Sequence, residues 1–129
     1  MESDPTISAN EKALMFREWF TKDFSTMASC GFSPSDFETM VRESRLLFRR
    51  GTAEMFVLAQ RNQLPVYVLS AGITEIIQNS FDCLDVDHTS PESQVRIISN
   101  VFKYKDGRTH SFEDLVTPDI KSCVLYDRH

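Results

Sequence analysis

The residues best suited to chemistry are Leu69-Ser70-Ala71-Gly72, which lie at the end of an apolar run from Val66 to Leu69. An unbroken β-prone run is typical of a central parallel strand that is buried on both faces. Apolar residues then recur at helical spacing from Ile73 to about Asn79. Because ligands bind beyond the carboxyl ends of strands in open parallel sheets, the sequence predicts a ligand site at Ser70.

This strand-to-helix turn is suited to holding a phosphate. The Ser70 hydroxyl, the backbone N–H of Ala71 and the positive end of the following helix could converge on one anion. Gly72 would let the backbone turn tightly with no side chain in the way. The alternative is that Ser70 or Thr74 merely caps the helix, and the pattern taken alone favours this capping interpretation.

Two amphipathic helices are expected before this strand. The first runs from an N-cap at Asn10 to Gly31, and the second from an N-cap at Ser33 to Gly51. We expect the two to form a helical hairpin whose aromatic stripes face each other as core. The inner stripe of the second helix comprises Phe37, Met40, Val41, Ser44, Leu47 and Phe48.

The rest of the chain alternates helix and strand signals. A third helix is expected from a cap at Thr52 to about Arg61, with Met55, Phe56 and Ala59 facing inward. Strands are expected at Val95–Ser99 and Cys123–Tyr126, with a hairpin between them around Asp106-Gly107. A helix, a buried strand, a tight turn and a helix make half of a doubly wound sheet, so the predicted class is α/β.

Composition narrows the class of protein. The 129 residues are 41% hydrophobic and 26% charged, which is ordinary for one globular domain. The net charge of −5 gives no electrostatic reason to bind nucleic acid or an anionic membrane. Three widely spaced cysteines indicate reduced thiols, and the acidic N-terminus is unlike a signal peptide. The longest apolar run is far too short to span a bilayer, so a cytoplasmic protein is expected.

Three segments in order and spacing carry a resemblance to a known family. They are Glu18-Trp19-Phe20-Thr21-Lys22, then Val41-Arg42-Glu43-Ser44 with Arg50-Gly51, then Pro65 to Ile73. Together they resemble the cytosolic pyrimidine 5′-nucleotidase family of the haloacid dehalogenase superfamily, whose strand ends F-S-A-G-I. Ile98-Ser99-Asn100 also resembles the family's V-S-N segment.

The resemblance implies a haloacid-dehalogenase-like Rossmannoid core, incomplete here, with an α-helical cap on its N-terminal side. Residues 1–51 would be the cap region. Residues 52–129 would be a partial α/β core with a β-hairpin around 101–112.

The resemblance also implies magnesium-dependent hydrolysis of nucleoside 5′-monophosphates, chiefly pyrimidine ones, to nucleoside and phosphate. Position by position, Ser70 and Ala71 would bind the phosphate, and Glu2 would contact the nucleobase. Asp127, after a short apolar strand, would be a candidate Mg²⁺ ligand. The alternatives are a solvated terminal residue for Glu2 and a surface aspartate for Asp127.

Several positions depart from the family pattern. The family's nucleophile motif, D-x-D-x-T, lies upstream of its cap, and no D-x-D precedes Glu18. Asp85-Val86-Asp87 has the spacing, but it lies in an acidic loop expected from Phe81 to Gln94 with no apolar strand before it. We therefore reject it as the nucleophile. Asp23 and Asp114 stand where the family has a serine and a lysine, and Lys121 could replace that lysine only if the loop were rearranged.

The hypothesis that follows is a fragment, isoform or divergent member that keeps the cap and the phosphate turn and lacks the nucleophile strand. The Val66 strand would then be an exposed edge. The first alternative is a catalytically inactive binding or interaction module. The second is a related phosphatase with another phosphorylated substrate. The sequence predicts no oligomeric state.

Overall fold

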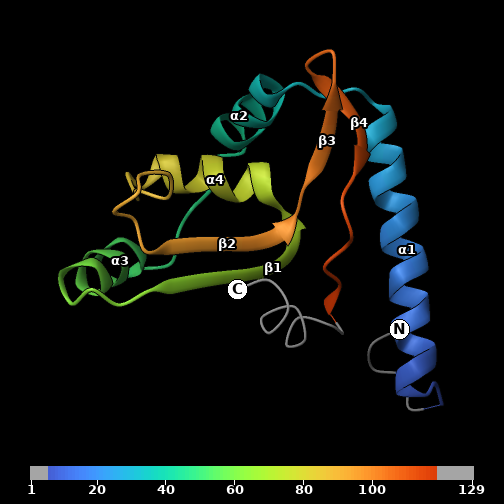
Figure 1. The fold of residues 1–129 in the computed structure, drawn as a ribbon, viewed down its shortest axis with the longest axis horizontal. Helices are drawn as coiled ribbons and strands as arrows, with labels where there is room; N and C mark the ends of the chain where they lie inside the picture. The colour runs from blue at the N-terminus through green and yellow to red at the C-terminus, as the bar shows by residue number, and fades with distance from the viewer. Residues whose placement is uncertain (1–5, 119–129) are drawn as a thin grey trace.

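A computed structural model describes residues 6–118 of the chain as a mixed arrangement of helices and strands (Figure 1). The elements in chain order are α1 (Ala9–Ser29), α2 (Pro34–Glu43), α3 (Thr52–Arg61), β1 (Val66–Ile73), α4 (Thr74–Cys83), β2 (Val95–Asn100), β3 (Phe102–Lys105) and β4 (Arg108–Phe112). The predictions at Glu2, Lys121, Cys123–Tyr126 and Asp127 lie outside the described residues.

β1 and β2 pair in parallel, as the βαβ interpretation requires. The register runs from Val66 opposite Val95 to Leu69 opposite Ile98. The prediction that β1 is buried on both faces is wrong: Tyr67 and Gly72 are exposed and its other residues are half-buried. The physical reason is that the sheet has two strands in the described part of the chain, with α4 lying over one face (Figure 1).

α1 begins at a serine that the sequence pattern should have identified. Its N-cap is Ser8 rather than the predicted Asn10, which lies inside the helix. The Ser8 hydroxyl accepts from the N–H of Glu11 at 3.2 Å, and the Glu11 carboxylate accepts from the N–H of Ser8 at 2.9 Å. This reciprocal capping box satisfies two N–H groups at once and outcompetes Asn10. Gly31 lies just after the helix with φ +67°, as predicted.

α2 begins where predicted and ends early. Ser33 and Asp36 form its capping box. The helix ends at Glu43, because Arg45 adopts a left-handed conformation with φ +53° that the helix cannot continue through. Leu47 is consequently 92% exposed. Met40 and Ser44 are exposed as well, so the prediction that these three residues belong to the inner stripe is wrong.

α3 and α4 differ from the expected helices at their ends. Gly51, with φ +87°, is the N-cap of α3 in place of Thr52. Met55 is exposed rather than inward, whereas Phe56 packs edge-on against Phe81 with ring centroids 5.2 Å apart. Phe81 lies within α4, which continues to Cys83, so the loop expected from Phe81 starts later.

The β3–β4 hairpin forms around Asp106-Gly107, as predicted. Both residues have positive φ, 53° and 74°, as a type I′ turn requires. The start of β4 also caps the end of α1. The Thr109 hydroxyl donates to the Ala28 carbonyl at 3.1 Å and accepts from the Phe32 N–H at 2.8 Å. The hairpin and α1 are therefore joined by polar as well as apolar contacts.

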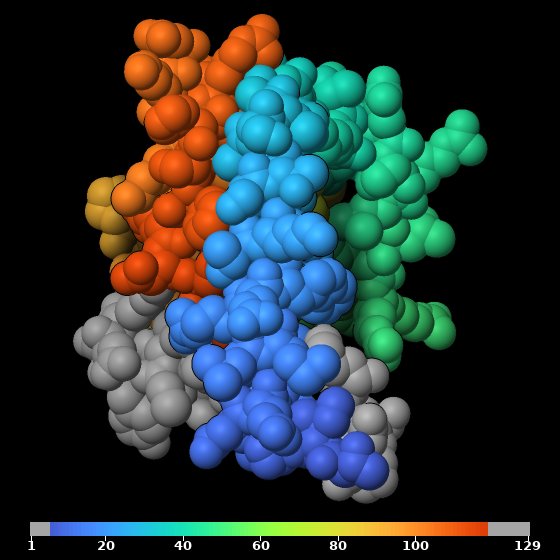
Figure 2. Space-filling view, turned by 90° about the vertical axis from the view of Figure 1, so that its right-hand side faces the viewer, coloured from blue at the N-terminus to red at the C-terminus, as the bar shows by residue number. Residues whose placement is uncertain are grey.

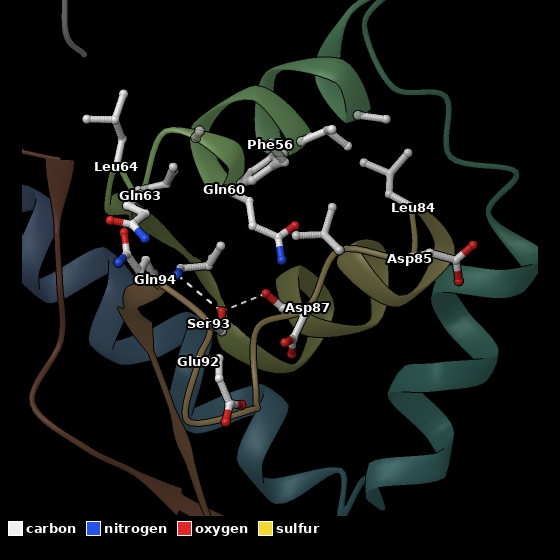
Figure 3. A pocket seen from close by; sticks show the side chains of 16 residues that line it. Phe56, Gln60, Gln63, Leu64, Leu84, Asp85, Asp87, Glu92, Ser93 and Gln94 are labelled. Carbon is white, nitrogen blue, oxygen red and sulfur yellow. Dashed lines mark hydrogen bonds between the residues drawn. The ribbon is translucent and has the colours of Figure 1, made fainter.

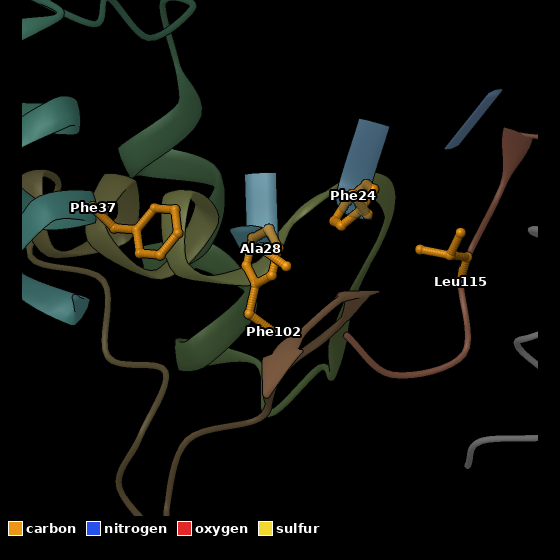
Figure 4. Close-up of a cluster of buried hydrophobic side chains, with 5 residues drawn as sticks. All are labelled: Phe24, Ala28, Phe37, Phe102 and Leu115. Carbon is orange, nitrogen blue, oxygen red and sulfur yellow. The ribbon is translucent and has the colours of Figure 1, made fainter. Parts of the chain in front are cut away.

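The predicted hairpin of α1 and α2 with facing aromatic stripes is wrong. α1 packs mainly on β4 and α2 mainly on α4. Phe102 of β3 lies between the helices instead: its ring centroid is 5.4 Å from that of Phe24 and 5.7 Å from that of Phe37 (Figure 4). Seen from the side, α1 crosses the surface beside the hairpin (Figure 2). The core therefore centres on a β-strand residue far along the chain.

Candidate phosphate-binding turn

Ser70 lies in an irregular stretch at the carboxyl end of β1. The pairing with β2 shifts register between Leu69 and Ile73, where Ile73 comes to lie opposite Asn100. β1 therefore continues through the predicted turn, and α4 begins at Thr74 rather than Ile73. Ser70 and Ala71 are half-buried rather than sealed in the interior. The turn is thus a bulged strand end that leads directly into a helix.

The Ser70 hydroxyl is held by its own backbone. It accepts a hydrogen bond from the N–H of Gly72 at 2.9 Å. Because a hydroxyl carries one hydrogen and two lone pairs, this contact leaves the hydrogen able to donate to an anion. A Cβ at Gly72 would lie only 3.1 Å from the Ser70 oxygen, so a side chain there would crowd the contact. The close approach of the Ser70 side chain to the backbone therefore explains why position 72 is a glycine.

Neither Ser70 nor Thr74 caps α4, so the capping alternative is wrong. The N-cap of α4 is Ile73, and no side chain caps the helix there. The Thr74 hydroxyl shares a short hydrogen bond with the hydroxyl of Ser99, a residue that is 2% exposed. The amino end of α4 therefore keeps the partial positive charge that favours a bound anion.

Asn100, at the end of β2, fixes the carbonyl side of the turn. Its side-chain amide donates to the carbonyl oxygens of Ala71 at 2.8 Å and Val116 at 3.0 Å, and its oxygen accepts from the N–H of Val116 at 2.6 Å. Asn100 is 1% exposed. Sequence reasoning assigned it no role. The available signal was a polar residue at the carboxyl end of an apolar strand.

Glu75 brings a carboxylate into the first turn of α4. Its carboxylate lies near the backbone of Phe102 and the side chain of Tyr104, while Oε2 is buried without a hydrogen-bond partner. Burial raises the pKa of Glu75, and these polar neighbours oppose the shift. Glu75 is therefore less readily ionised than a solvent-exposed glutamate.

The other predicted residues do not join this turn. Glu2, Lys121 and Asp127 lie outside the described residues, while Asp23 and Asp114 are exposed. Within residues 6–118, no three His, Cys, Asp or Glu side chains come together as a metal site.

Asp85-Val86-Asp87 lines a pocket at the opposite end of the sheet. The pocket has a volume of about 500 Å³ and reaches Val66 and Val95, the first residues of β1 and β2 (Figure 3). The Ser90 hydroxyl, together with the N–H groups of Ser90 and Thr89 at 3.1 Å, donates to the Asp87 carboxylate and lowers the pKa of Asp87. The motif therefore lies at the end of the sheet opposite the candidate phosphate turn, and its rejection as the nucleophile stays a prediction.

A shallow groove along α1 was not expected. It has a volume of about 520 Å³ and is lined by Met15, Glu18, Trp19 and Lys22. Trp19 is 51% exposed. α1 lies on the side toward which the carboxyl end of β1 points (Figure 1). The sequence signal was an aromatic residue outside the apolar stripe of the helix.

The fold and the turn define an α/β protein with a candidate anion site at the carboxyl end of a parallel strand. A family model described as pyrimidine 5′-nucleotidase (UMPH-1) matches residues 1–119. The chain belongs to this pyrimidine 5′-nucleotidase family, which confirms the resemblance inferred from the sequence motifs.

Individual relatives agree with the family match. The chain is 27% identical over 114 residues to the 7-methylguanosine phosphate-specific 5′-nucleotidase of Homo sapiens, covering 88% of this chain and 37% of the relative. It is 28% identical over 78 residues to a putative cytosolic 5′-nucleotidase 3 of Caenorhabditis elegans, covering 60% of this chain and 21% of the relative. The chain thus spans well under half of the length of the curated relatives it matches.

A solved structure shares the fold. The crystal structure of cytosolic 5′-nucleotidase IIIB bound to cytidine superposes with a TM-score of 0.72 at 27% identity. The match covers 88% of this chain and 37% of the other. In the described part of this chain, no helix is both long and apolar enough to cross a membrane.

Proposed function

We propose that the whole protein hydrolyses nucleoside 5′-monophosphates to nucleoside and phosphate in the cytosol, and that this chain contributes the phosphate-binding turn. The observation that carries the proposal is the Ser70 hydroxyl, held by Gly72 at 2.9 Å beside the uncapped amino end of α4. Membership of the pyrimidine 5′-nucleotidase family and the names of the relatives support it. Residues 1–51 are proposed as cap and residues 52–129 as partial core.

The phosphate would be held by local donors against a net charge of −5. The Ser70 hydroxyl and the N–H of Ala71 would donate to its oxygens, and the dipole of α4 would favour its charge. Each hydrogen bond to a charged group is worth about 1.5–3 kcal/mol. Two or three such contacts give measurable affinity even where the overall charge is unfavourable.

The nucleophile and the metal are proposed to come from outside the described residues. The resemblance implies an aspartate that attacks phosphorus, in a D-x-D-x-T segment upstream of the cap. No D-x-D precedes Glu18 in this sequence. Magnesium is proposed as the cofactor with Asp127 as one ligand, and it would neutralise charge on the phosphoryl group when bound. The 129 residues alone are expected to bind phosphate and to turn over little or no substrate.

The base is proposed to lie toward α1. Trp19 offers an open aromatic face, and Glu18 and Glu2 offer carboxylates that can accept from an exocyclic amine. The family description names pyrimidine nucleotides, the human relative's name specifies 7-methylguanosine phosphate, and the solved neighbour holds cytidine. Specificity should therefore be measured across CMP, UMP and 7-methylguanosine 5′-monophosphate.

The test uses the chain expressed together with whatever coding sequence lies in frame upstream of Met1. We expect phosphate release from at least one of the three nucleotides, dependent on Mg²⁺ and abolished by Ser70→Asp. Release at the same rate by Ser70→Asp would refute the role of the turn. Absence of any D-x-D-x-T segment upstream, together with no release, would refute the enzymatic proposal.

A second candidate is a non-catalytic nucleotide-binding or interaction module. The observation that favours it is that Asp23 and Asp114 carry exposed carboxylates where the family pattern has a serine and a lysine. In that case nucleotide would bind at Ser70 without release of phosphate in any context. The same assay, run beside a binding measurement, separates the two functions.

A further inference from the structure

Asn100 uses its side chain to hold two segments that are distant in sequence. Both hydrogens of its amide are donated, to the carbonyl oxygens of Ala71 and Val116, and its oxygen accepts from the N–H of Val116. At 1% exposure it has almost no contact with water. A side chain this buried and this well satisfied specifies one arrangement of its partners.

The hydrogen bond from Asn100 to the Ala71 carbonyl also fixes the orientation of the Ala71–Gly72 peptide. The peptide bond is planar and trans, so the carbonyl of Ala71 and the N–H of Gly72 point in opposite directions. Asn100 holds the carbonyl at 2.8 Å, and the Ser70 hydroxyl holds the N–H at 2.9 Å. The peptide is thus fastened on both sides, which fixes the position of the Ser70 oxygen.

We propose that Asn100 is a positioning residue for the phosphate turn, acting through the Ala71–Gly72 peptide to aim the Ser70 hydroxyl at an anion. This inference rests on the proposed function of the turn. Asn100 itself would not touch the phosphate, because its amide hydrogens are already donated to Ala71 and Val116.

Asn100→Asp is the sharpest substitution, because the side chain keeps its shape. One carboxylate oxygen can still accept from the N–H of Val116. The other would face the carbonyl oxygens of Ala71 and Val116, where the amide donated before, and acceptors that face each other repel. The Ala71 carbonyl should turn away, and the Gly72 N–H and Ser70 hydroxyl would move with it.

Thr109→Val provides the matched control. Thr109 is 5% exposed, and its hydroxyl also bonds two backbone groups, but these lie at the end of α1. Both substitutions should lower the thermal midpoint of unfolding. Only Asn100→Asp should disturb the phosphate turn.

The experiment is a titration of each chain with inorganic phosphate, followed in the backbone amide signals of Ser70 to Ile73. We expect Asn100→Asp to weaken binding about tenfold or more, the equivalent of losing one well-placed hydrogen bond, while Thr109→Val binds as the wild type does. Equal affinity in Asn100→Asp, or equal loss in Thr109→Val, would overturn the inference. If the wild-type chain itself shows no response, the proposed function fails instead.

A measurement on the wild type covers the case in which Asn100→Asp does not fold. The side-chain amide signals of Asn100 should shift as phosphate saturates the turn, although the side chain is sealed from solvent. Shifts at Ser70 to Ile73 with no movement of the Asn100 side-chain signals would contradict the coupling.

Discussion

Tyr104 on β3 and Glu75 in the first turn of α4 lie close enough that each shifts the pKa of the other. This interaction links the hairpin that carries Phe102 to the helix that begins at the phosphate turn. Burial raises the pKa of Glu75. Burial, followed by the negative charge of Glu75, raises the pKa of Tyr104 to about 12. The pKa values of Glu75 and Tyr104 therefore indicate whether the hairpin packs against the helix that follows the turn.

Glu75→Gln should change how stability depends on pH. Because the pKa of Glu75 is raised in the folded chain, its favourable contribution is present below the ordinary carboxyl pKa and is lost as the pH rises through the raised value. The wild type should therefore lose stability relative to Glu75→Gln as the pH rises from mildly acidic toward neutral. Urea unfolding across this range measures the difference, and a difference independent of pH would contradict the burial of Glu75.

The same substitution should lower the pKa of Tyr104. Glu75→Gln removes the carboxylate charge that opposes ionisation of the phenol. The Tyr104 ring signals should then titrate below the wild-type value of about 12, while remaining above the ordinary value of 10.0 because the ring stays partly buried. An unchanged titration of Tyr104 would show that the two groups do not interact in solution.

Phe102→Ala should be among the most damaging substitutions in the core. Phe102 is 2% exposed and contacts the rings of Phe24 and Phe37 on two helices. Loss of a buried phenylalanine costs about 3–5 kcal/mol of unfolding free energy. Leu47→Ala, at a side chain that is 92% exposed, should change it by less than about 0.5 kcal/mol. Chemical denaturation compares the two, and similar costs would contradict the packing.

Ser33→Ala should destabilise α2. The Ser33 hydroxyl accepts from the N–H of Asp36 at 3.3 Å, and the Asp36 carboxylate accepts from the N–H of Ser33 at 2.8 Å. Removing such an N-cap costs about 1 kcal/mol. Differential scanning calorimetry should show a lower midpoint for Ser33→Ala. An unchanged midpoint would mean that α2 is held by its packing on α4 alone.

Local signals predicted the parts of the fold that local chemistry determines. Asp106-Gly107 indicated the hairpin and Ser33 the start of α2, because each acts through its own backbone. The apolar run after Pro65 indicated β1 and its parallel partner. The contacts of α1 and α2 could not be predicted in this way, because their shared partner Phe102 lies far along the chain.

In the candidate site, too, local contacts could be predicted from sequence and contacts between distant segments could not. Ser70 and Gly72 could be proposed from sequence as a strand end and a tight turn, and the contact between them is local, spanning two residues. The role of Asn100 was missed, because it depends on two strands in parallel register and on a third segment at Val116. The early end of α2 was missed because the left-handed conformation of Arg45 has no clear sequence signature.

The most direct test of the central claim is a titration of the 129-residue chain with CMP and with inorganic phosphate, wild type against Ser70→Asp, observed through backbone amide signals. We predict saturable shifts at Ala71, Gly72 and Ile73 in the wild type, and their loss in Ser70→Asp, where a carboxylate replaces the hydroxyl donor. Saturable binding that leaves these amides unmoved, or identical shifts in Ser70→Asp, would contradict the account.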